Sequence, residues 1–309
     1  MVIKTPISPA RVPGVVRMFH LLECSRNGEV FWQSSAYANF DAVMLTIRKG
    51  QMTVSLSLHK HYYKDKEGTL DNSRMFTIRQ ALDAIGELVA QMGLTPPRCR
   101  VTYYEVGLNL PMSRDPLEYI SAASGCVGRE MFIDANYAKD RQRTTTREHG
   151  VRRIFKMYDK TWEARSKGRE ADDNILRLET IYRHQSITLE EFMSQAFIES
   201  VERLFHECWS ALAFRRDVAA ARPGIKRSQL EKARELIACG TSDAYLVECR
   251  RRLAGGELTP KMFRVCREFA QQWPELQTMF LLVPSDMERE YDDRFCEMFG
   301  RAVSGFVGK

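Results

Sequence analysis

The sequence predicts an α+β protein in which a mostly antiparallel sheet with packed helices precedes a helical C-terminal domain. Three observations predict this class: apolar and polar residues alternate along several segments of the first half, helical periodicity dominates from Thr188 onward, and turn-forming residues separate the segments. With 309 residues, 44% of them hydrophobic and 28% charged, the chain can bury a core of one large domain or two ordinary ones.

Four segments show the alternation typical of strands with one apolar and one polar face: residues 52–61, 99–110, 153–160 and 175–182. If these strands share one sheet, their polar side chains gather on one face. The residues concerned are His59, His61, Glu105, Asn109, Lys156, Tyr158, Lys160, Arg177 and Glu179.

Helices are predicted by apolar residues that recur every three or four positions. Residues 77–92 show this spacing, and Gly93 ends the helix. A capping box at 188–191 starts a long amphipathic helix that includes 192–214. Beyond Arg222-Pro223-Gly224, short helices are predicted at 228–239, 242–253 and 259–272. They suit a helix-turn-helix-like DNA-binding module and equally a packing or oligomerisation domain.

These elements divide the chain into three expected parts. Residues 1–187 form the sheet domain, 188–222 a long connecting helix, and 223–309 the helical C-terminal domain.

The net charge of +6 is unevenly distributed. Residues 141–169 hold ten Lys and Arg against three acidic residues, so this stretch carries +7. A basic cluster of this kind suits a nucleic-acid phosphate backbone, and a solvated basic loop is the plain alternative.

Other classes are disfavoured by composition. No apolar run approaches the roughly 20 residues that span a bilayer, and the N-terminal residues are too polar for a secretory signal, so no membrane association is expected. The eight cysteines are scattered, without Cys-x-x-Cys or Cys/His ligand spacing. We therefore expect reduced thiols in a cytoplasm.

The polar face carries the groups that phosphodiester chemistry needs. A tyrosine can attack phosphorus and become joined to DNA, carboxylates or imidazoles can hold a divalent cation, and lysine or arginine can stabilise the developing charge. Each group also has an ordinary interpretation: a surface histidine pair, a salt-bridged glutamate, an exposed strand tyrosine.

The ordered motifs carry a resemblance. Ser57-Leu-His-Lys60, Glu105-Val-Gly-Leu-Asn109, Phe155-Lys-Met-Tyr-Asp-Lys160 and Ile175-Leu-Arg-Leu-Glu179 follow one another at fitting intervals. Over residues 31–214 the chain resembles the phage and plasmid gene II/X replication initiation proteins, which are relatives of the filamentous-phage initiator. The Tyr-Asp-Lys and Arg-x-Glu pattern is also similar to trans-acting plasmid rolling-circle initiators.

The resemblance implies origin-specific nicking of one DNA strand by a nickase-like domain at 1–187, attachment through tyrosine and later resealing. It implies Mg²⁺ or Mn²⁺ held by Glu105 and Glu179, with His59 assisting. The implied catalytic residues are Tyr158 as nucleophile and Lys160 with Arg177 as phosphate contacts. Tyr62, Tyr63, Tyr104 and Tyr182 remain alternative nucleophiles.

The expected partners are single- and double-stranded origin DNA, a host helicase and a single-strand-binding protein, in the cytoplasm of a bacterial host cell. The basic stretch supplies the expected DNA contacts, which are Arg143, Arg147, Arg152, Arg153 and Lys156.

Two departures and two competing functions remain. Lys60 separates the histidines where related endonucleases have an apolar residue, and the gene II/X pattern has an aromatic residue at position 61, which weakens a histidine-based metal site. A non-catalytic DNA-binding replication or transcription regulator would use the same basic stretch and helical C-terminus. A structural or assembly protein would leave the polar face merely solvated.

Overall fold

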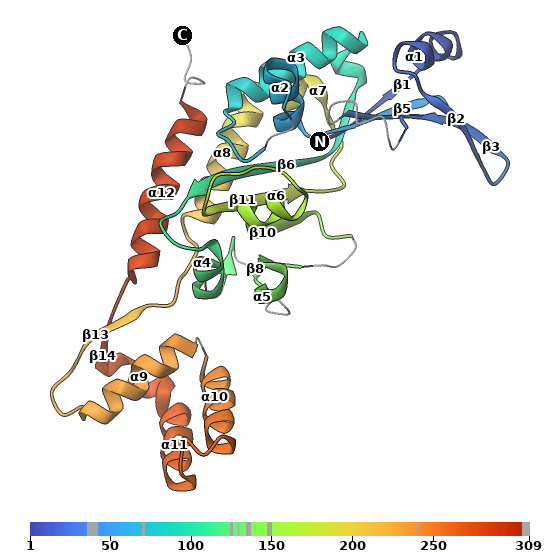
Figure 1. The fold of residues 1–309 in the computed structure, drawn as a ribbon. Coiled ribbons are helices and arrows are strands. Elements are labelled where there is room, and N and C mark those ends of the chain that lie inside the picture. Colours follow the sequence, from blue (N-terminus) through green and yellow to red (C-terminus); the bar gives the residue numbers. More distant parts are fainter. Residues whose placement is uncertain are drawn as a thin grey trace.

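The computed structural model describes residues 1–35, 43–69, 72–123, 126–128, 130–133, 137–146, 150–239 and 241–304. Within them the predicted α+β class is confirmed, with a large antiparallel sheet and a helical C-terminal region. Figure 1 shows a main body that contains this sheet, and a smaller helical module that two strands join to it.

The main sheet is antiparallel at every described pairing and runs in the order β2-β3-β4-β5-β1-β6-β11-β10-β9, with β12 pairing to β6 off this path. Its strands are β1 Val2–Pro6, β2 Leu22–Arg26, β3 Glu29–Gln33, β4 Val43–Arg48, β5 Gln51–Leu56, β6 Arg100–Pro111, β9 Gln142–Thr144, β10 Arg153–Asp159, β11 Ile175–Tyr182 and β12 Ile187–Thr188. Strand β6 pairs first with β1 and then with β11, so it joins the two halves of the sheet.

Helices cover the sheet in the main body (Figure 1). They are α1 Val12–Met18, α2 Leu58–Glu67, α3 Ile78–Met92, α4 Pro116–Ala122, α5 Tyr137–Asp140, α6 Lys160–Ser166, α7 Leu189–Phe192, α8 Gln195–Trp209 and α12 Asp286–Val303, with short 3₁₀ turns at Pro9–Arg11 and Pro96–Arg98. A two-stranded ribbon, β7 Cys126–Val127 with β8 Glu130–Met131, lies beside them. The predicted helix at 77–92 is confirmed: Thr77 makes the capping box with Gln80, and Gly93 ends it in the left-handed conformation.

Two apolar cores hold the body together. One packs α3 and α7 on β1, β4 and β5, and includes Ile3, Val54 and Leu88. The other packs α4, α8 and α12 on β6, β10 and β11. In this second core the hydroxyl of Tyr291 donates a 2.8 Å hydrogen bond to the Trp209 carbonyl, and the Trp209 indole donates one of 3.0 Å to Thr180. The apolar faces of the three predicted strands at 99–110, 153–160 and 175–182 are thereby buried.

The prediction of one strand over residues 52–61 was wrong in its second half. Strand β5 ends at Leu56, and helix α2 begins at Leu58. Ser57 caps this helix by accepting a hydrogen bond from the backbone N–H of Lys60. The serine side chain accepts a hydrogen bond from a backbone N–H of the first helical turn, which has no partner within the helix. This local preference for a helix start overrides the strand pattern that the alternating residues predicted. His59 and His61 therefore lie on a helix.

The predicted parts beyond residue 188 also differ from the structure. In place of one helix through 214, α7 ends at Phe192 and α8 ends at Trp209. Ser194 caps α8 because its side chain accepts a hydrogen bond from the backbone N–H of Phe197, and α8 therefore begins as a helix separate from α7. No single connecting helix is therefore present among the described residues of 188–222.

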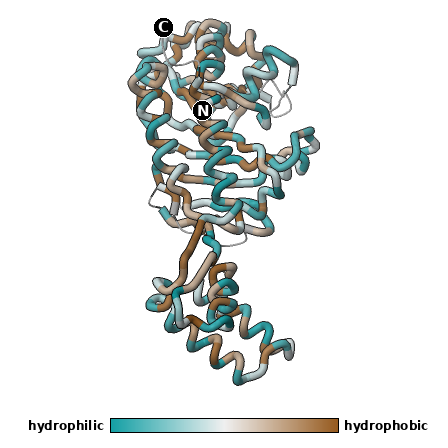
Figure 2. Tube along the Cα trace, turned by 90° about the vertical axis from the view of Figure 1, so that its left-hand side faces the viewer, coloured by the Kyte–Doolittle hydropathy of each residue, from teal (hydrophilic) through white to brown (hydrophobic). Residues whose placement is uncertain are grey.

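The C-terminal region contains a module with its own core. Its helices are α9 Arg227–Cys239, α10 Ser242–Ala254 and α11 Pro260–Leu276, followed by a 3₁₀ turn at Gln277–Met279, and they confirm the predicted short helices. Strands β13 Asp217–Ala221 and β14 Phe280–Val283 pair with each other and link the module to the body. Figure 2 shows this narrow connection from the side, with its hydrophobic strand in brown.

The module does not extend to the C-terminus, contrary to the predicted domain at 223–309. Helix α12 returns to the body, where Tyr291, Phe295 and Met298 join the second core. The apolar face of α12 requires a partner, and the sheet domain supplies it. The module is thus an insertion between α8 and α12. No helix in the described part of the chain is long and apolar enough to cross a membrane.

Candidate active site

Three neighbouring strands bring the predicted polar residues onto one face. In the pairing of β10 with β11, Tyr158 lies opposite Arg177 and Lys156 opposite Glu179. In the pairing of β11 with β6, Arg177 lies opposite Asn109 and Glu179 opposite Gly107. Because side chains alternate between faces along each strand, these groups point to the same side of the sheet. The predicted common face of these strands is confirmed.

A hydrogen-bond chain links the centre of this face. The Tyr158 hydroxyl donates a 3.0 Å hydrogen bond to Oε1 of Glu179. The same oxygen accepts a 2.6 Å hydrogen bond from Nε of Arg177, and both partners of this ion pair are nearly buried. The carboxylate is therefore fixed from two sides, by a phenol and by a guanidinium.

Asn109 anchors the other end of the chain. Its Oδ1 accepts a 2.8 Å hydrogen bond from Nη1 of Arg177. Its Nδ2 lies within hydrogen-bond distance of three carbonyls of the loop before α3, those of Asn72, Ser73 and Arg74, at 3.2, 2.6 and 3.1 Å. Asn109 is buried, and its side-chain amide bonds to both the loop and Arg177, so it holds the two in a fixed position relative to each other.

Gly107 makes room for the guanidinium. A Cβ atom at this position would lie 2.6 Å from Nη2 and 2.9 Å from Cζ of Arg177, and 3.2 Å from Cγ of Glu179. Such contacts are too close for any side chain, so only glycine lets Arg177 lie against β6. Arg177 consequently occupies the space between Glu179 and the strand that bears Glu105.

Burial and charge set the protonation of these groups. Burial raises the pKa of Tyr158 well above its usual value, although the Arg177 charge opposes this. Burial also disfavours ionised Glu179, but the charges of Arg177 and Lys156 and the hydrogen bonds from Arg177 and Tyr158 together outweigh it and lower the pKa of the carboxyl. Near neutral pH the centre therefore holds a protonated phenol beside an ionised carboxylate.

Two lysines flank the Tyr158 ring. Nζ of Lys156 lies 4.1 Å from the ring centroid and that of Lys160 lies 6.0 Å from it. Lys156 is half-buried, whereas Lys160 is 1% exposed and forms a 2.6 Å ion pair with Glu163. Burial lowers the pKa of Lys160 to about 8. Lys156 is thus the lysine available to a phosphate, and the predicted contact Lys160 is enclosed at the start of α6.

The three predicted metal ligands do not come together as a metal site. Glu105 is exposed and accepts a hydrogen bond from Tyr103, while Glu179 is engaged by Tyr158 and Arg177. His59 stacks on Phe76 with ring centroids 4.6 Å apart. Burial, together with the Arg177 and Lys160 charges, lowers the pKa of His59 to about 2.

Nε2 of His59 is buried without a hydrogen-bond partner, so a ligand atom is free, but its charged neighbours are cations. Across the described ranges, no group of three or more His, Cys, Asp or Glu side chains is placed to hold a metal ion. As arranged, the residues do not fit a preformed metal centre, because Glu179 already pairs with the Arg177 guanidinium and Glu105 is bonded by Tyr103.

The predicted DNA contacts of the basic stretch separate onto different surfaces. Arg143 is 4% exposed and donates to the Ala123 carbonyl, so its prediction as a surface contact was wrong. Arg153 lies on the face opposite Tyr158, over the Phe155 ring at 5.0 Å. Arg152 is exposed and Lys156 borders the candidate site, while Arg147 lies outside the described residues. Strand alternation divides a basic sequence run between two faces.

The alternative tyrosines have other surroundings. Tyr104 and Tyr182 stack on each other at 4.5 Å within the first core, on the opposite face of the sheet. The Tyr63 hydroxyl donates to the Met75 carbonyl. Tyr62 lies half-buried on α2. Tyr158 differs from them because it bonds to a carboxylate on the polar face.

The sequence patterns placed Asn109 on the polar face, but they assigned no role to it or to Gly107. A glycine inside a strand that otherwise alternates was the available signal for Gly107. For Asn109 no signal identified the loop carbonyls as partners.

A comparison of the chain with protein-family models and with curated proteins finds no match.

Proposed function

We propose that this protein initiates rolling-circle DNA replication by nicking and resealing one strand at an origin through a covalent tyrosyl–DNA intermediate. The observation that carries the proposal is the hydrogen bond from Tyr158 to Glu179, whose accepting oxygen is also held by Arg177. A nucleophile bonded to a proton acceptor that a third group orients is the arrangement used in covalent catalysis. The ordered motifs of the sequence support the same activity.

The chemistry is a pair of transesterifications. The Tyr158 oxygen attacks the phosphorus of the scissile phosphodiester, and its proton passes to the Glu179 carboxylate. The P–O3′ bond breaks, the 5′-phosphate remains on the tyrosine, and the 3′-oxygen leaves with a proton from water. In resealing, the 3′-hydroxyl attacks the phosphotyrosine and loses its proton to water, while Tyr158 leaves and regains a proton from Glu179.

Cationic side chains around Tyr158 support the electrostatic part of this chemistry. Charge accumulates on the non-bridging phosphate oxygens during each attack. Arg177 and Lys156 border Tyr158 and carry the positive charge that would offset it. An incoming phosphate that binds Arg177 would also weaken its pairing with Glu179, and so make that carboxylate a better proton acceptor.

Dependence on Mg²⁺ or Mn²⁺ stays a prediction, and no step above is routed through a metal. We further propose that the protein works in the cytoplasm of a bacterial host cell on single- and double-stranded origin DNA. A host helicase and a single-strand-binding protein would act on the strand that it displaces.

Trapping the covalent adduct tests the proposal. Wild-type protein incubated with supercoiled origin DNA should yield nicked circles and a protein band that carries labelled DNA after denaturation. Tyr158→Phe should lose both. Tyr182→Phe is the matched control because the Tyr182 hydroxyl is buried without a partner, so its loss should leave the adduct intact. An adduct that persists in Tyr158→Phe would refute the assignment.

A second candidate is a non-catalytic DNA-binding regulator. The separate helical module favours it, since residues 215–283 hold thirteen Lys and Arg against eight acidic residues, a net +5. Such a regulator would bind DNA equally well with a chelator present and would form no adduct in the wild-type protein. The trapping experiment therefore separates the two functions.

A further inference from the structure

A cavity of about 660 Å³ opens beside the candidate active site. It lies between the start of α2, the helix α3, the strand β6 and the helices α7 and α8. Arg177 lines this cavity and also bonds to Glu179, so the cavity and the Tyr158 centre share a side chain. Its volume is within the range of pockets that bind small molecules.

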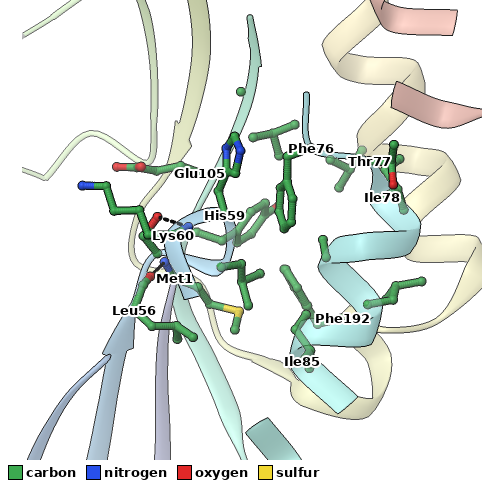
Figure 3. Close-up of a pocket in the computed structure, with 18 of the residues that line it drawn as sticks. Met1, Leu56, His59, Lys60, Phe76, Thr77, Ile78, Ile85, Glu105 and Phe192 are labelled. Atoms are coloured by element: carbon green, nitrogen blue, oxygen red, sulfur yellow. Dashed lines mark hydrogen bonds between the residues drawn. The ribbon is translucent and has the colours of Figure 1, made fainter. Parts of the chain in front are cut away.

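One side of the cavity is apolar. Figure 3 shows Phe76, Ile78, Ile85 and Phe192 gathered on this side, with the ring of His59 next to Phe76. The His59 and Phe76 rings are nearly parallel, at 8°. Flat aromatic and aliphatic walls of this kind can contact the face of another planar ring.

The other side is charged. Lys60, Arg169 and Arg177 supply cations and Glu105 an anion (Lys60 and Glu105 are labelled in Figure 3). The ligand suggested by this arrangement has a flat apolar part and an anionic part, because the apolar wall and the cations meet in one cavity.

Strand β6 adds hydrogen-bonding groups. Its pairing with β1 ends at Tyr103, while its pairing with β11 continues to Pro111. From Glu105 to Leu108 the edge of β6 away from β11 pairs with no strand in the described part of the chain, and these residues line the cavity. Backbone N–H and C=O groups at a free edge can bond the rim of a heterocycle.

We propose that this cavity binds the base of an unpaired nucleotide next to the scissile phosphate. The inference rests on the proposed function for the position of the phosphate, at Arg177. A base has two apolar faces, a polar rim and an adjoining phosphate, and these match the walls, the free edge and the cations in turn. Single-strand-binding proteins combine aromatic stacking with cationic grooves in this way. A base must leave the duplex stack to enter such a cavity, so the site selects unpaired DNA.

The test measures binding without chemistry. Tyr158→Phe protein is titrated with single-stranded oligonucleotides that carry one 2-aminopurine at successive positions, and with the corresponding duplexes. The fluorescence of 2-aminopurine should change on binding at one or two positions of the single strand, and at none in the duplex. Uniform changes at every position, or none at all, would overturn the proposal.

Two substitutions on one helix sharpen the result. Ala81 lines the cavity, so Ala81→Phe fills it, whereas Ala90→Phe adds the same ring on the exposed face of α3. Stacking of one base contributes about 1–3 kcal/mol, so Ala81→Phe should weaken single-strand binding roughly tenfold and abolish the position-specific signal. Ala90→Phe should change neither. Equal affinity and an unchanged signal in Ala81→Phe would refute base binding.

A second variant and a second measurement guard against misfolding and a different ligand. Phe76→Leu removes the ring on which His59 stacks without filling the cavity, and should also reduce the signal. Mass spectrometry of the denatured protein would reveal a co-purified lipid or other apolar molecule, which would overturn the proposal. A positive binding result with no wild-type adduct would refute the nickase function alone, so the two failures are distinguishable.

Discussion

Arg177 and Gly107 lie on adjacent strands so closely that a Cβ on the glycine would stand 2.6 Å from Nη2 of the arginine. The guanidinium that Gly107 admits then bonds to Glu179 and Asn109. The geometry of the candidate site therefore depends on residue 107 being a glycine, because any Cβ at this position would displace Arg177.

Gly107→Ala should displace Arg177 and destabilise the protein. Overpacking of a buried site costs about 1–3 kcal/mol, and the free energy of unfolding in urea should fall by that amount. Formation of the covalent protein–DNA adduct should also decrease, because Arg177 and Glu179 lose their alignment. Gly86→Ala is the control: a Cβ there meets nothing within 4 Å, and helix propensity predicts a gain of up to about 1 kcal/mol. Equal stability of Gly107→Ala and wild type would contradict the packing argument.

Asn109→Ala should loosen the loop before α3. The substitution leaves Arg177 Nη1 and the carbonyls of Asn72, Ser73 and Arg74 without this amide. Unsatisfied buried groups cost about 1–3 kcal/mol, so unfolding should require correspondingly less urea. Hydrogen exchange of the amides around residues 72–76 should accelerate while exchange in α12 stays slow. Unchanged exchange at 72–76 would show that Asn109 does not anchor the loop.

Glu163→Gln should destabilise the start of α6 because it leaves buried Lys160 without its ion-pair partner. Breaking a buried pair costs about 3 kcal/mol. The exposed pair of Arg165 with Asp173 supplies the control, since Asp173→Asn should cost under about 1 kcal/mol. Similar losses in the two variants would show that Lys160 does not depend on Glu163.

The same pair predicts how stability varies with pH. Burial opposes ionisation of Glu163, but its ion pairs with Lys160 and Lys167 lower its pKa from 4.5 to about 2. A lowered carboxyl pKa adds stability that is complete above pH 4.5 and lost as pH falls toward 2. Lys160 acts in the opposite range: burial lowers its pKa from 10.5 to about 8, so its contribution to the free energy of unfolding rises between pH 8 and 10.5. Comparison of urea unfolding of wild type and Glu163→Gln across both ranges checks this, and the acidic loss should be smaller in the variant.

Lys156→Gln should weaken DNA binding and reduce its salt dependence. Each lysine that contacts a phosphate contributes roughly 0.7–0.9 to the slope of log affinity against log salt. Lys156 lies beside Tyr158, so its loss should lower the slope by about that amount. Arg153→Gln lies three residues before Lys156 on the opposite face of β10, so it removes an equal charge away from the site and should leave the slope unchanged. Equal effects of both variants would show that DNA binding does not depend on which face of β10 carries the charge.

Local sequence patterns determined much of this fold. Alternation in 99–110, 153–160 and 175–182 predicted strands that the structure contains as β6, β10 and β11, with their polar residues on one face. Apolar residues recurring every three or four positions, together with turn-forming residues at the helix ends, predicted α3 and the short helices of the module. These patterns act over a few residues, so a single sequence carries them in full.

Only the tertiary structure decided which polar groups meet. The serine cap that turned His59 onto a helix, the burial of Arg143 and the return of α12 to the body each depend on competition between local and distant contacts. So does the pairing of Tyr158, Glu179, Arg177 and Asn109, which lie up to 70 positions apart in the sequence. Periodicity states which face a side chain takes, but the choice of its partner depends on strand register and burial, which arise only when distant segments pack.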